Sequence, residues 1–304
     1  MKMVCNIMKI LERDAWLRKS LRYRDYFFTR QINRIKTKKH LVGSTGTIED
    51  ITVVLAVRNR CDYRLVNAFK SMRNQDYDDR LIKIVLVDYD SEKWMIEKYK
   101  EICQRFRVEY IRVDDKPLWN KSRCLNIAIK NVASKYICSS DVDVFFEKNY
   151  FSECVKELNK TPLQVLISDF YNSPEGEING EIDLPGKYAD IKNKCGFQNT
   201  KMGLSGFLNP GINFSLSCFY KAMNGYDENY IMWGSEDFDL IKRFFLMGLE
   251  VKDMSPTTSW IHQWHKKHEG VSTVPDIKEQ ITKNKNYLNN TRSIVRNNNG
   301  WGMV

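Results

Sequence analysis

The chain has 304 residues, of which 42% are hydrophobic, so it can bury a substantial core in one large domain with appendages or in two small domains. Its longest clean apolar run, Ile51 to Val57, is far shorter than the roughly 20 residues of a membrane span. The N-terminus also lacks a secretory hydrophobic region and a cleavage site. These features argue against a membrane-spanning or secreted protein and predict a cytoplasmic one.

The positive charge is concentrated at the N-terminus. The net charge is +10, and residues 1–50 hold twelve Lys and Arg against five Asp and Glu, while the remaining chain is nearly balanced. This distribution predicts a basic helical arm and linker over residues 1–48, and no nucleic-acid partner is expected. Between Trp16 and Phe28, aromatic and basic residues interleave, as in helices that lie on an anionic bilayer. Residues 1–45 could therefore bind the cytoplasmic membrane face peripherally, or form a solvated helix packed on the main domain.

The cysteines are scattered through the chain without a C-x-x-C pair. Several of the eight lie inside apolar stretches, which is typical of small buried hydrophobic residues. Neither a zinc cluster nor a disulfide framework is expected.

After a linker at Thr45–Thr47, short apolar runs alternate with helical stretches. Strands are expected, in chain order, at Ile51–Val57, Ile82–Val87, Val108–Ile111, Tyr136–Cys138 and Val165–Ile167. Helices are expected between them at Tyr63–Arg73, Lys93–Arg105 and Lys121–Val132. This alternation is typical of βαβ units and predicts an α/β fold with a mostly parallel sheet flanked by helices.

The pattern weakens in the second half of the chain. From Tyr171 to Pro210, Gly, Pro, Asn and charged residues predict a long loop, and such loops often carry function. A helix is expected at Glu236–Met247 and a strand at Leu249–Lys252. The tail from Asn284 to Asn299 is rich in Asn and basic residues and is predicted to be irregular.

Two carboxylates, Asp141 and Asp143, directly follow the predicted strand at Tyr136–Cys138. The carboxyl ends of strands in open α/β sheets are where ligands bind. Such a pair suits a divalent cation that carries a diphosphate, since Mg²⁺ and Mn²⁺ prefer hard oxygen ligands. The same spacing also occurs by chance in solvated loops, so the rest of the chain must decide.

A basic helix start precedes the acids by about twenty residues. Lys121 and Arg123, with the free N–H groups of the first turn, could cradle phosphates. The alternative is an ordinary first turn, although the helix dipole disfavours basic residues there.

Three acids lie in the first turn of the predicted helix at Glu236–Met247. In the structural interpretation, Ser235 caps the helix, Glu236 and Asp237 complement its dipole, and Asp239 pairs with Arg243. In the functional interpretation, a carboxylate held here is a catalytic base or an acceptor-hydroxyl ligand.

Three of the four histidines, His262, His265 and His268, lie at spacings of three residues. Imidazoles could complete a cation site begun by Asp141 and Asp143, and mixed nitrogen and oxygen ligation suits Mn²⁺ better than Mg²⁺. A zinc site built from the histidines alone is the alternative.

Over roughly Ile51 to Gly270, the chain resembles the family 2 inverting glycosyltransferases of GT-A fold. Its second half is similar to the domain shared by bacterial chondroitin-polymerase-type enzymes and animal β-1,4-galactosyltransferases. The residues that carry the resemblance, in this order, are Ala56–Arg60, Val87–Ser91, Asn120–Asn126, Asp141–Asp143, Gly211–Ser215, Asn224–Glu228, Trp233–Asp237, His262 and His265.

The resemblance implies roles for individual residues. Asp143 and His265 would bind the metal, with Asp141 and His262 in reach, and Asp141 could instead hold the ribose. Asp237 would be the catalytic base and Glu236 an acceptor ligand. With the phosphate cradle, the donor-binding residues would be Ala56, Arg58, Asn59, Asp88, Lys121, Arg123, Asp141, Val142 and Trp233. The chain departs from the family pattern with Val-Arg-Asn at residues 57–59 and with Ser235 where Gly is frequent.

The sequence thus predicts a Mn²⁺- or Mg²⁺-dependent inverting transferase. It would move a hexose or N-acetylhexosamine, with galactose favoured, from a UDP-sugar to a saccharide or glycolipid acceptor in surface polysaccharide or glycan synthesis. Residues 49–270 would form the catalytic domain, and residues 271–304 a tail that packs on or covers the active site. A retaining UDP-sugar transferase and a noncatalytic membrane- or polyanion-binding protein are the alternatives.

Overall fold

The computed structural model describes residues 30, 33–34, 36–38, 48–114, 118–168, 170–184, 186–198, 211–266 and 277–304. Within these ranges no helix is long and apolar enough to cross a membrane. The predicted linker at Thr45–Thr47, the aromatic and basic segment Trp16–Phe28 and His268 lie outside the described residues.

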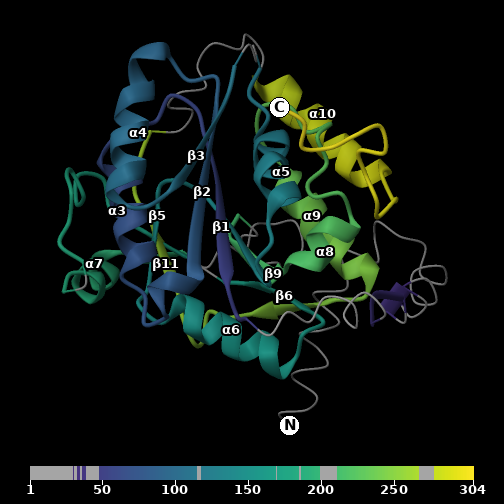
Figure 1. Ribbon diagram of the computed structural model, residues 1–304, viewed down its shortest axis with the longest axis horizontal. Coiled ribbons are helices and arrows are strands. Elements are labelled where there is room, and N and C mark those ends of the chain that lie inside the picture. The colour runs from purple at the N-terminus through teal and green to yellow at the C-terminus, as the bar shows by residue number, and fades with distance from the viewer. Residues whose placement is uncertain are drawn as a thin grey trace.

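A seven-stranded sheet in the order β10-β6-β9-β4-β1-β2-β3 forms the centre of the fold (Figure 1). Every neighbouring pair is parallel except those made by β9, which runs antiparallel to β4 and β6. The strands are β1 (Ile51–Val57), β2 (Ile82–Tyr89), β3 (Glu109–Val113), β4 (Tyr136–Ser140), β6 (Gln164–Ile167), β9 (Asn213–Leu216) and β10 (Glu250–Asp253). The predicted α/β fold with a mostly parallel sheet is therefore confirmed.

Helices cover both faces of this sheet. In Figure 1, α3 and α4 lie on one side of β1 and β2, and α5, α8 and α9 lie on the other side. The helices are α3 (Tyr63–Arg73), α4 (Ile96–Arg105), α5 (Lys121–Asn131), α6 (Tyr150–Lys160), α8 (Ser217–Ala222) and α9 (Glu236–Met247). All seven residues of β1 are buried, which explains why its sequence is a continuous apolar run and not an alternating one.

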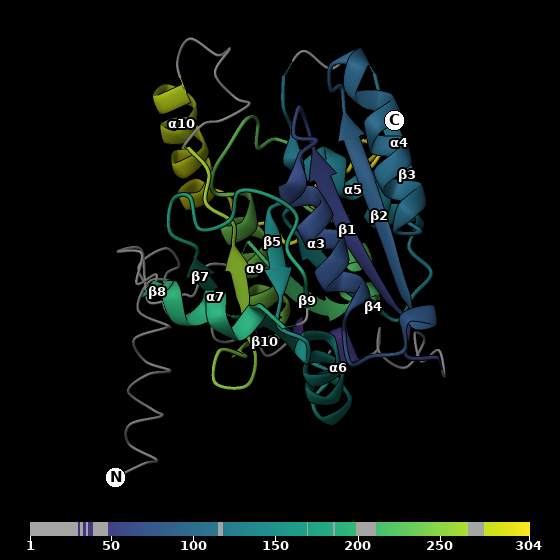
Figure 2. The same ribbon diagram turned by 90° about the vertical axis from the view of Figure 1, so that its left-hand side faces the viewer.

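A second, four-stranded sheet lies beside the first and has the order β5-β11-β7-β8. Its strands are β5 (Val144–Phe146), β7 (Phe170–Asn172), β8 (Gly196–Gln198) and β11 (Trp260–His262). Helix α7 (Tyr188–Lys194) packs on it through a small apolar cluster that includes Phe145, Tyr188, Ile191 and Ile261. Figure 2 shows α7 and β8 at the edge of the molecule away from α4.

Two sequence predictions about irregular segments were wrong. The stretch Tyr171–Pro210 contains part of β7 and all of α7 and β8, because the second sheet gives these short elements a core to pack on. Helix α10 (Ile277–Asn290) takes in residues 284–290 of the tail that was predicted to be irregular. Asn284 and Leu288, one helical turn apart, are its buried face.

Most of the described cysteines are buried, as predicted. All seven that the structure describes are free thiols, and five of them are buried. Among the described residues there is accordingly no disulfide.

The C-terminal end of α9 is fastened by the few described residues of the N-terminal arm. Arg30, Asn33 and Thr37 donate to the carbonyl oxygens of Leu249, Leu246 and Met247 at 3.4, 3.0 and 2.8 Å. They thereby satisfy carbonyl groups that a helix end leaves without partners. Gly248 ends the helix with φ of 101°, and a Cβ there would lie 2.7 Å from the Cα of Arg34, so only glycine fits.

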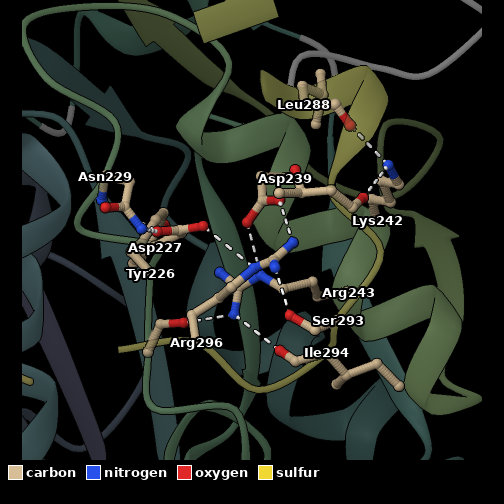
Figure 3. A network of polar contacts seen from close by, with 12 residues as sticks. Tyr226, Asp227, Asn229, Asp239, Lys242, Arg243, Leu288, Ser293, Ile294 and Arg296 are labelled. Carbon is tan, nitrogen blue, oxygen red and sulfur yellow. Dashed lines mark hydrogen bonds and ion pairs between the residues drawn. The ribbon is translucent and has the colours of Figure 1, made fainter. Parts of the chain in front are cut away.

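A buried ion pair on α9 anchors the helix. Arg243 Nε donates to Asp239 Oδ2 at 2.6 Å, and both side chains are almost fully buried (Figure 3). This confirms the pairing expected from their i, i+4 spacing. The guanidinium also donates to the Gly225 carbonyl at 2.8 Å, which ties α9 to the segment that follows α8.

We predict that Arg243→Met destabilises the protein by about 3–5 kcal/mol, because it leaves the Asp239 carboxylate buried without its main counter-charge. Urea unfolding followed by circular dichroism measures this change. Lys283→Met, which removes an exposed i, i+4 partner of Glu279, is the matched control and should cost less than about 1 kcal/mol. Equal unfolding midpoints for the two variants would contradict the assigned role of the pair.

Candidate active site

The acid pair lies where the sequence predicted it, at the carboxyl end of β4. Asp141 and Asp143 belong to the turn between β4 and β5. The antiparallel pairing of β5 with β11 aligns Val144 with His262, and the Gln263 amide donates to the Asp143 carbonyl at 2.9 Å. Strand register therefore brings His262 next to Asp143 across 119 residues of chain.

Asp143, His262 and His265 form a cluster that could hold a metal ion. Their ligand atoms all lie within 4.8 Å of one another. The Nε2 atoms of His262 and His265 are 3.7 and 3.2 Å from Asp143 Oδ2. The Nδ1 atoms lie 2.9 Å from Asn172 Oδ1 and from the Lys266 carbonyl, respectively. When both Nδ1 atoms carry their proton and donate to these oxygens, the Nε2 atoms beside the carboxylate can offer lone pairs to a cation, as in metal-ligating histidines.

The electrostatics of Asp143 favour its anionic form. Burial alone would raise the pKa of this carboxyl, but the imidazoles of His262 and His265 and the guanidinium of Arg60 hold it well below its ordinary value. Arg60 Nη1 donates directly to Asp143 Oδ2. A hydrogen bond to Asp143 raises the pKa of His265, while burial lowers that of His262. Two imidazoles and one guanidinium thus keep the buried Asp143 carboxylate ionised.

Lys121 joins the acid pair to the start of α9. Its Nζ lies 2.8 Å from Asp141 Oδ1 and 3.2 Å from Asp237 Oδ2, and its side chain is only 12% exposed. The two carboxylates keep the pKa of this ammonium well above its usual range against the opposing effect of burial. In this geometry Asp141 lies outside the triad of ligand atoms, and Lys121 binds carboxylates instead of standing free for a phosphate.

The loop before α9 is tied to the start of α5. Asn120 forms an isolated parallel bridge with Met232 and donates from its side chain to the Glu228 carbonyl at 2.8 Å. The same side chain accepts from the Arg123 amide and caps α5, so the first turn offers fewer N–H groups to a phosphate than the sequence predicted. This coupling explains how Lys121 meets Asp237.

The start of α9 differs in one respect from the expected helix start, in which the Ser235 side chain caps the helix. Ser235 occupies the N-cap position without a side-chain hydrogen bond, so the predicted serine cap was wrong. Its φ is 79°, a left-handed conformation that glycine adopts at lower cost, which accounts for the glycine that the family favours here. The turn places Trp233, 54% exposed, directly before the acids.

Asp237 is a carboxyl whose pKa its surroundings raise. Burial raises its pKa well above the ordinary value, Lys121 opposes this, and Glu236 and Asp141 add to it. Among the described residues, Asp237 Oδ1 has no hydrogen-bond partner although it is buried, while Oδ2 accepts from Lys121. One oxygen is therefore held by Lys121, and the other is buried without a hydrogen-bond partner among the described residues.

A pocket of about 690 Å³ lies at the ends of β1 and β2. Its walls are Arg58, Asn59, Asp90, Ser91, Glu92, Lys93, Ile96, Arg112 and Asp114. Asp88, predicted to line a nucleotide pocket, is fully buried beneath this wall. It accepts from Arg112 Nη1, the Tyr110 hydroxyl and the Ser91 amide at 2.6, 2.7 and 3.0 Å, and so positions two residues that do line the pocket.

The predicted site residues separate into three groups in the structure. Arg58 and Asn59 line the pocket, whereas Ala56 and Val142 are buried near the strand ends. Asp143 joins the histidines, and Asp141 joins Lys121 and Asp237. Arg123 belongs to none of these groups, because its side chain donates to the Met303 carbonyl at 3.2 Å.

Sequence reasoning missed Arg60, Asn172 and Arg112. Arg60 stands in the quoted motif Ala56–Arg60, so its charge after a strand was the available signal. Asn172 meets His262 only through the pairing of β7 with β11, for which the sequence carries no local signal.

Two family models match this chain. Glycosyl transferase family 2 matches residues 52–208, just over half of the chain, and a model described as the N-terminal domain of galactosyltransferase matches residues 195–267. No curated protein matches the sequence.

Solved structures match at low identity. S. aureus TarS 1–349 in complex with UDP-GlcNAc aligns with a TM-score of 0.58 and 12% identity, over 79% of this chain and 65% of that one. GalNAc-T7 with UDP, GalNAc and Mn²⁺ aligns with a TM-score of 0.58 and 15% identity, over 79% of this chain and 48% of that one. The chain thus spans about two thirds of the TarS fragment and half of GalNAc-T7.

The extent of the first family match and the topology shared with these structures lead to one conclusion: the chain belongs to glycosyl transferase family 2 and has the GT-A fold.

Proposed function

We propose that this chain is a metal-dependent inverting glycosyltransferase that moves a hexose or N-acetylhexosamine from a UDP-sugar to a saccharide hydroxyl. The observation that carries the proposal is that two sets of residues lie next to each other. The first is the cluster of Asp143, His262 and His265. The second begins two residues before Asp143, where Asp141 pairs with Lys121, and Lys121 also pairs with Asp237. The match to a galactosyltransferase model favours a galactose-type sugar, and the nucleotides in the TarS and GalNAc-T7 structures support a UDP donor.

The metal-binding cluster fits Mn²⁺. One carboxylate and two imidazoles give the mixed oxygen and nitrogen ligation that suits Mn²⁺ better than Mg²⁺. Asp143, His262 and His265 would hold the ion, with Asn172 and Lys266 orienting the two rings. A bound cation would neutralise charge on the departing diphosphate.

In the proposed reaction, Asp237 accepts the proton of the acceptor hydroxyl. The bond from the anomeric carbon to the diphosphate oxygen breaks, and UDP leaves with the bonding electrons. The acceptor oxygen forms the new bond to the anomeric carbon and gives its proton to Asp237 Oδ1, the oxygen without a partner among the described residues. Lys121 holds the other oxygen and opposes the effect of burial, which raises the pKa of this carboxyl.

The residues around Asp237 suit a saccharide acceptor. Trp233 offers an exposed aromatic face of the kind on which a sugar ring can pack, and Glu236 is buried beside the base. A screen of UDP-sugars with purified protein and Mn²⁺, read as UDP release, tests the proposed function. NMR of the anomeric proton in the product distinguishes inversion from retention, and a noncatalytic binding protein would release no UDP.

We predict that Asp143→Ala abolishes Mn²⁺-dependent UDP release, because the cluster loses its only carboxylate and the diphosphate charge stays uncompensated. Titration of activity with Mn²⁺ after EDTA treatment measures this. Asp183→Ala, at an exposed carboxylate, is the control and should titrate like the wild type. Full turnover by Asp143→Ala in EDTA would refute the metal requirement.

Asp237→Asn keeps the shape of the side chain but removes the proton acceptor, so we expect kcat to fall by roughly 10²- to 10⁴-fold. The KM for the donor should change little. Glu236→Gln should mainly raise the KM for the acceptor. If Glu236→Gln lost kcat while Asp237→Asn kept it, the two roles would have to be exchanged.

The basic residues of the N-terminal arm lead to a proposal about where the protein is located. Each Lys or Arg close to an anionic bilayer contributes about 1 kcal/mol, so the cluster Arg18, Lys19, Arg22 and Arg24 could hold the enzyme at the cytoplasmic membrane face. Replacing these four residues with Ala should abolish flotation with vesicles that contain phosphatidylglycerol. Substitution is preferable to deletion, because Arg30, Asn33 and Thr37 support α9. Unchanged flotation would exclude this role.

A further inference from the structure

The last part of the chain, residues 291–304, forms a strap that follows α10 and lies against the loop between α8 and α9. We refer to these segments as the C-terminal strap and the 224–235 loop. The loop carries Trp233 and leads directly to Glu236 and Asp237. Figure 2 shows α10, which precedes the strap, at the end of the molecule toward which the arrowheads of β1 and β2 point.

Asn297 makes most of the hydrogen bonds between the strap and the loop. Its Nδ2 donates to the carbonyls of Asn224 and Tyr226 at 2.9 and 2.7 Å, and its Oδ1 accepts from the Glu228 amide at 3.0 Å. One amide side chain thus bonds three backbone groups of the loop, of which the Tyr226 carbonyl also accepts from Asn126 of α5 at 2.8 Å. Its φ is 51°, a conformation that asparagine tolerates better than most residues.

A second set of contacts extends from the strap to α5. The Glu228 carboxylate accepts from the Gly302 amide and from Asn126 Nδ2, each at 2.8 Å. The Glu228 carbonyl accepts from Asn120, which immediately precedes Lys121. Gly302 lies so close to α5 that a Cβ would be 2.5 Å from the Asn126 carbonyl oxygen. The strap therefore contacts the helix that carries the ammonium bound to Asp237.

The third set of contacts reaches α9 through buried charges. Arg296 Nε lies 3.1 Å from Asp227 Oδ2, and its Nη2 lies 3.8 Å from Asp239 Oδ1 (Figure 3). Asp227 also accepts from the Tyr287 hydroxyl of α10 at 2.9 Å. The carboxylates of Asp227 and Asp239 are both fully buried. Breaking either pair would leave a buried charge without a partner, and this cost in free energy holds the pairs in one arrangement.

The strap therefore fixes the 224–235 loop against both helices that supply the proposed proton-transfer groups, although none of its described contacts is to Asp237, Lys121 or the metal-binding cluster. From these contacts we infer that the C-terminal strap, through Asn297 and Gly302, positions the acceptor side of the active site for transfer and plays no part in donor binding. This inference rests on the proposed function, because it assumes that Asp237 accepts the proton.

Two variants test the positioning role. Asn297→Asp keeps the acceptor for the Glu228 amide but replaces two donated hydrogen bonds with repulsion between oxygens. Gly302→Ala forces the strap away from α5. Misplacement of a catalytic group by about 1 Å can cost up to about 10²-fold in rate, so we expect kcat for UDP release with water as acceptor to fall about tenfold.

Donor binding should be unaffected in the same variants. The Kd for UDP with Mn²⁺, measured by calorimetry, and the KM for the UDP-sugar should stay within about twofold of wild type, because no described residue of the strap or of the 224–235 loop lines the pocket at the ends of β1 and β2. Hydrogen exchange followed by mass spectrometry should rise in residues 224–235 and stay unchanged in β1 and β2. Asn299→Ala, at an exposed asparagine of the same strap, is the matched control and should leave every measurement unchanged.

The possible outcomes separate the two hypotheses. Unchanged kcat in both variants, with exchange raised in the loop, would overturn the positioning role and leave the proposed function intact. Parallel losses of kcat and of UDP binding would overturn it as well, since they would indicate general unfolding. If wild-type protein released UDP from none of the UDP-sugars, the proposed function would fail and the positioning role with it.

Discussion

The ion pairs of Lys121 hold the candidate active site together. A single ammonium lies between Asp141, which follows β4, and Asp237, which begins α9, and its side chain is only 12% exposed. Without this positive charge, the carboxylates of Asp141 and Asp237 would repel one another, which would favour the protonated form of the more buried Asp237. The two ion pairs therefore fix the distance between Asp141 and Asp237. They also reduce the net negative charge between the end of β4 and the start of α9.

The candidate metal-binding cluster of Asp143, His262 and His265 depends on a second constraint, the register of the smaller sheet. Side chains on a strand alternate between faces, so a slip of one residue between β5 and β11 would turn His262 away from Asp143. The paired strand β7 also supplies Asn172, which orients the same ring. The smaller sheet beside the seven-stranded sheet thus has a direct chemical purpose in the proposed mechanism.

The sequence predicted those parts of the fold that local pattern determines. The alternation of buried strands and amphipathic helices placed β1, α3 and α9 at their observed bounds, and i, i+4 spacing identified the pair of Asp239 with Arg243. It could not predict α10, because the buried face of that helix has meaning only once the loop before α9 lies against it. The link from Lys121 to Asp237 spans 116 residues and was likewise beyond any local pattern.

Two carboxylates at the same end of the sheet are driven in opposite directions by their surroundings. Imidazoles and a guanidinium depress the pKa of Asp143, whereas burial and neighbouring acids raise that of Asp237. A group that must stay anionic to hold a cation belongs in the first environment, and a group that must accept a proton belongs in the second. Residues of the same type can therefore be assigned different roles by their neighbours. The polar contacts of the C-terminal strap matter in the same way, since they determine which neighbours the acids of α9 have.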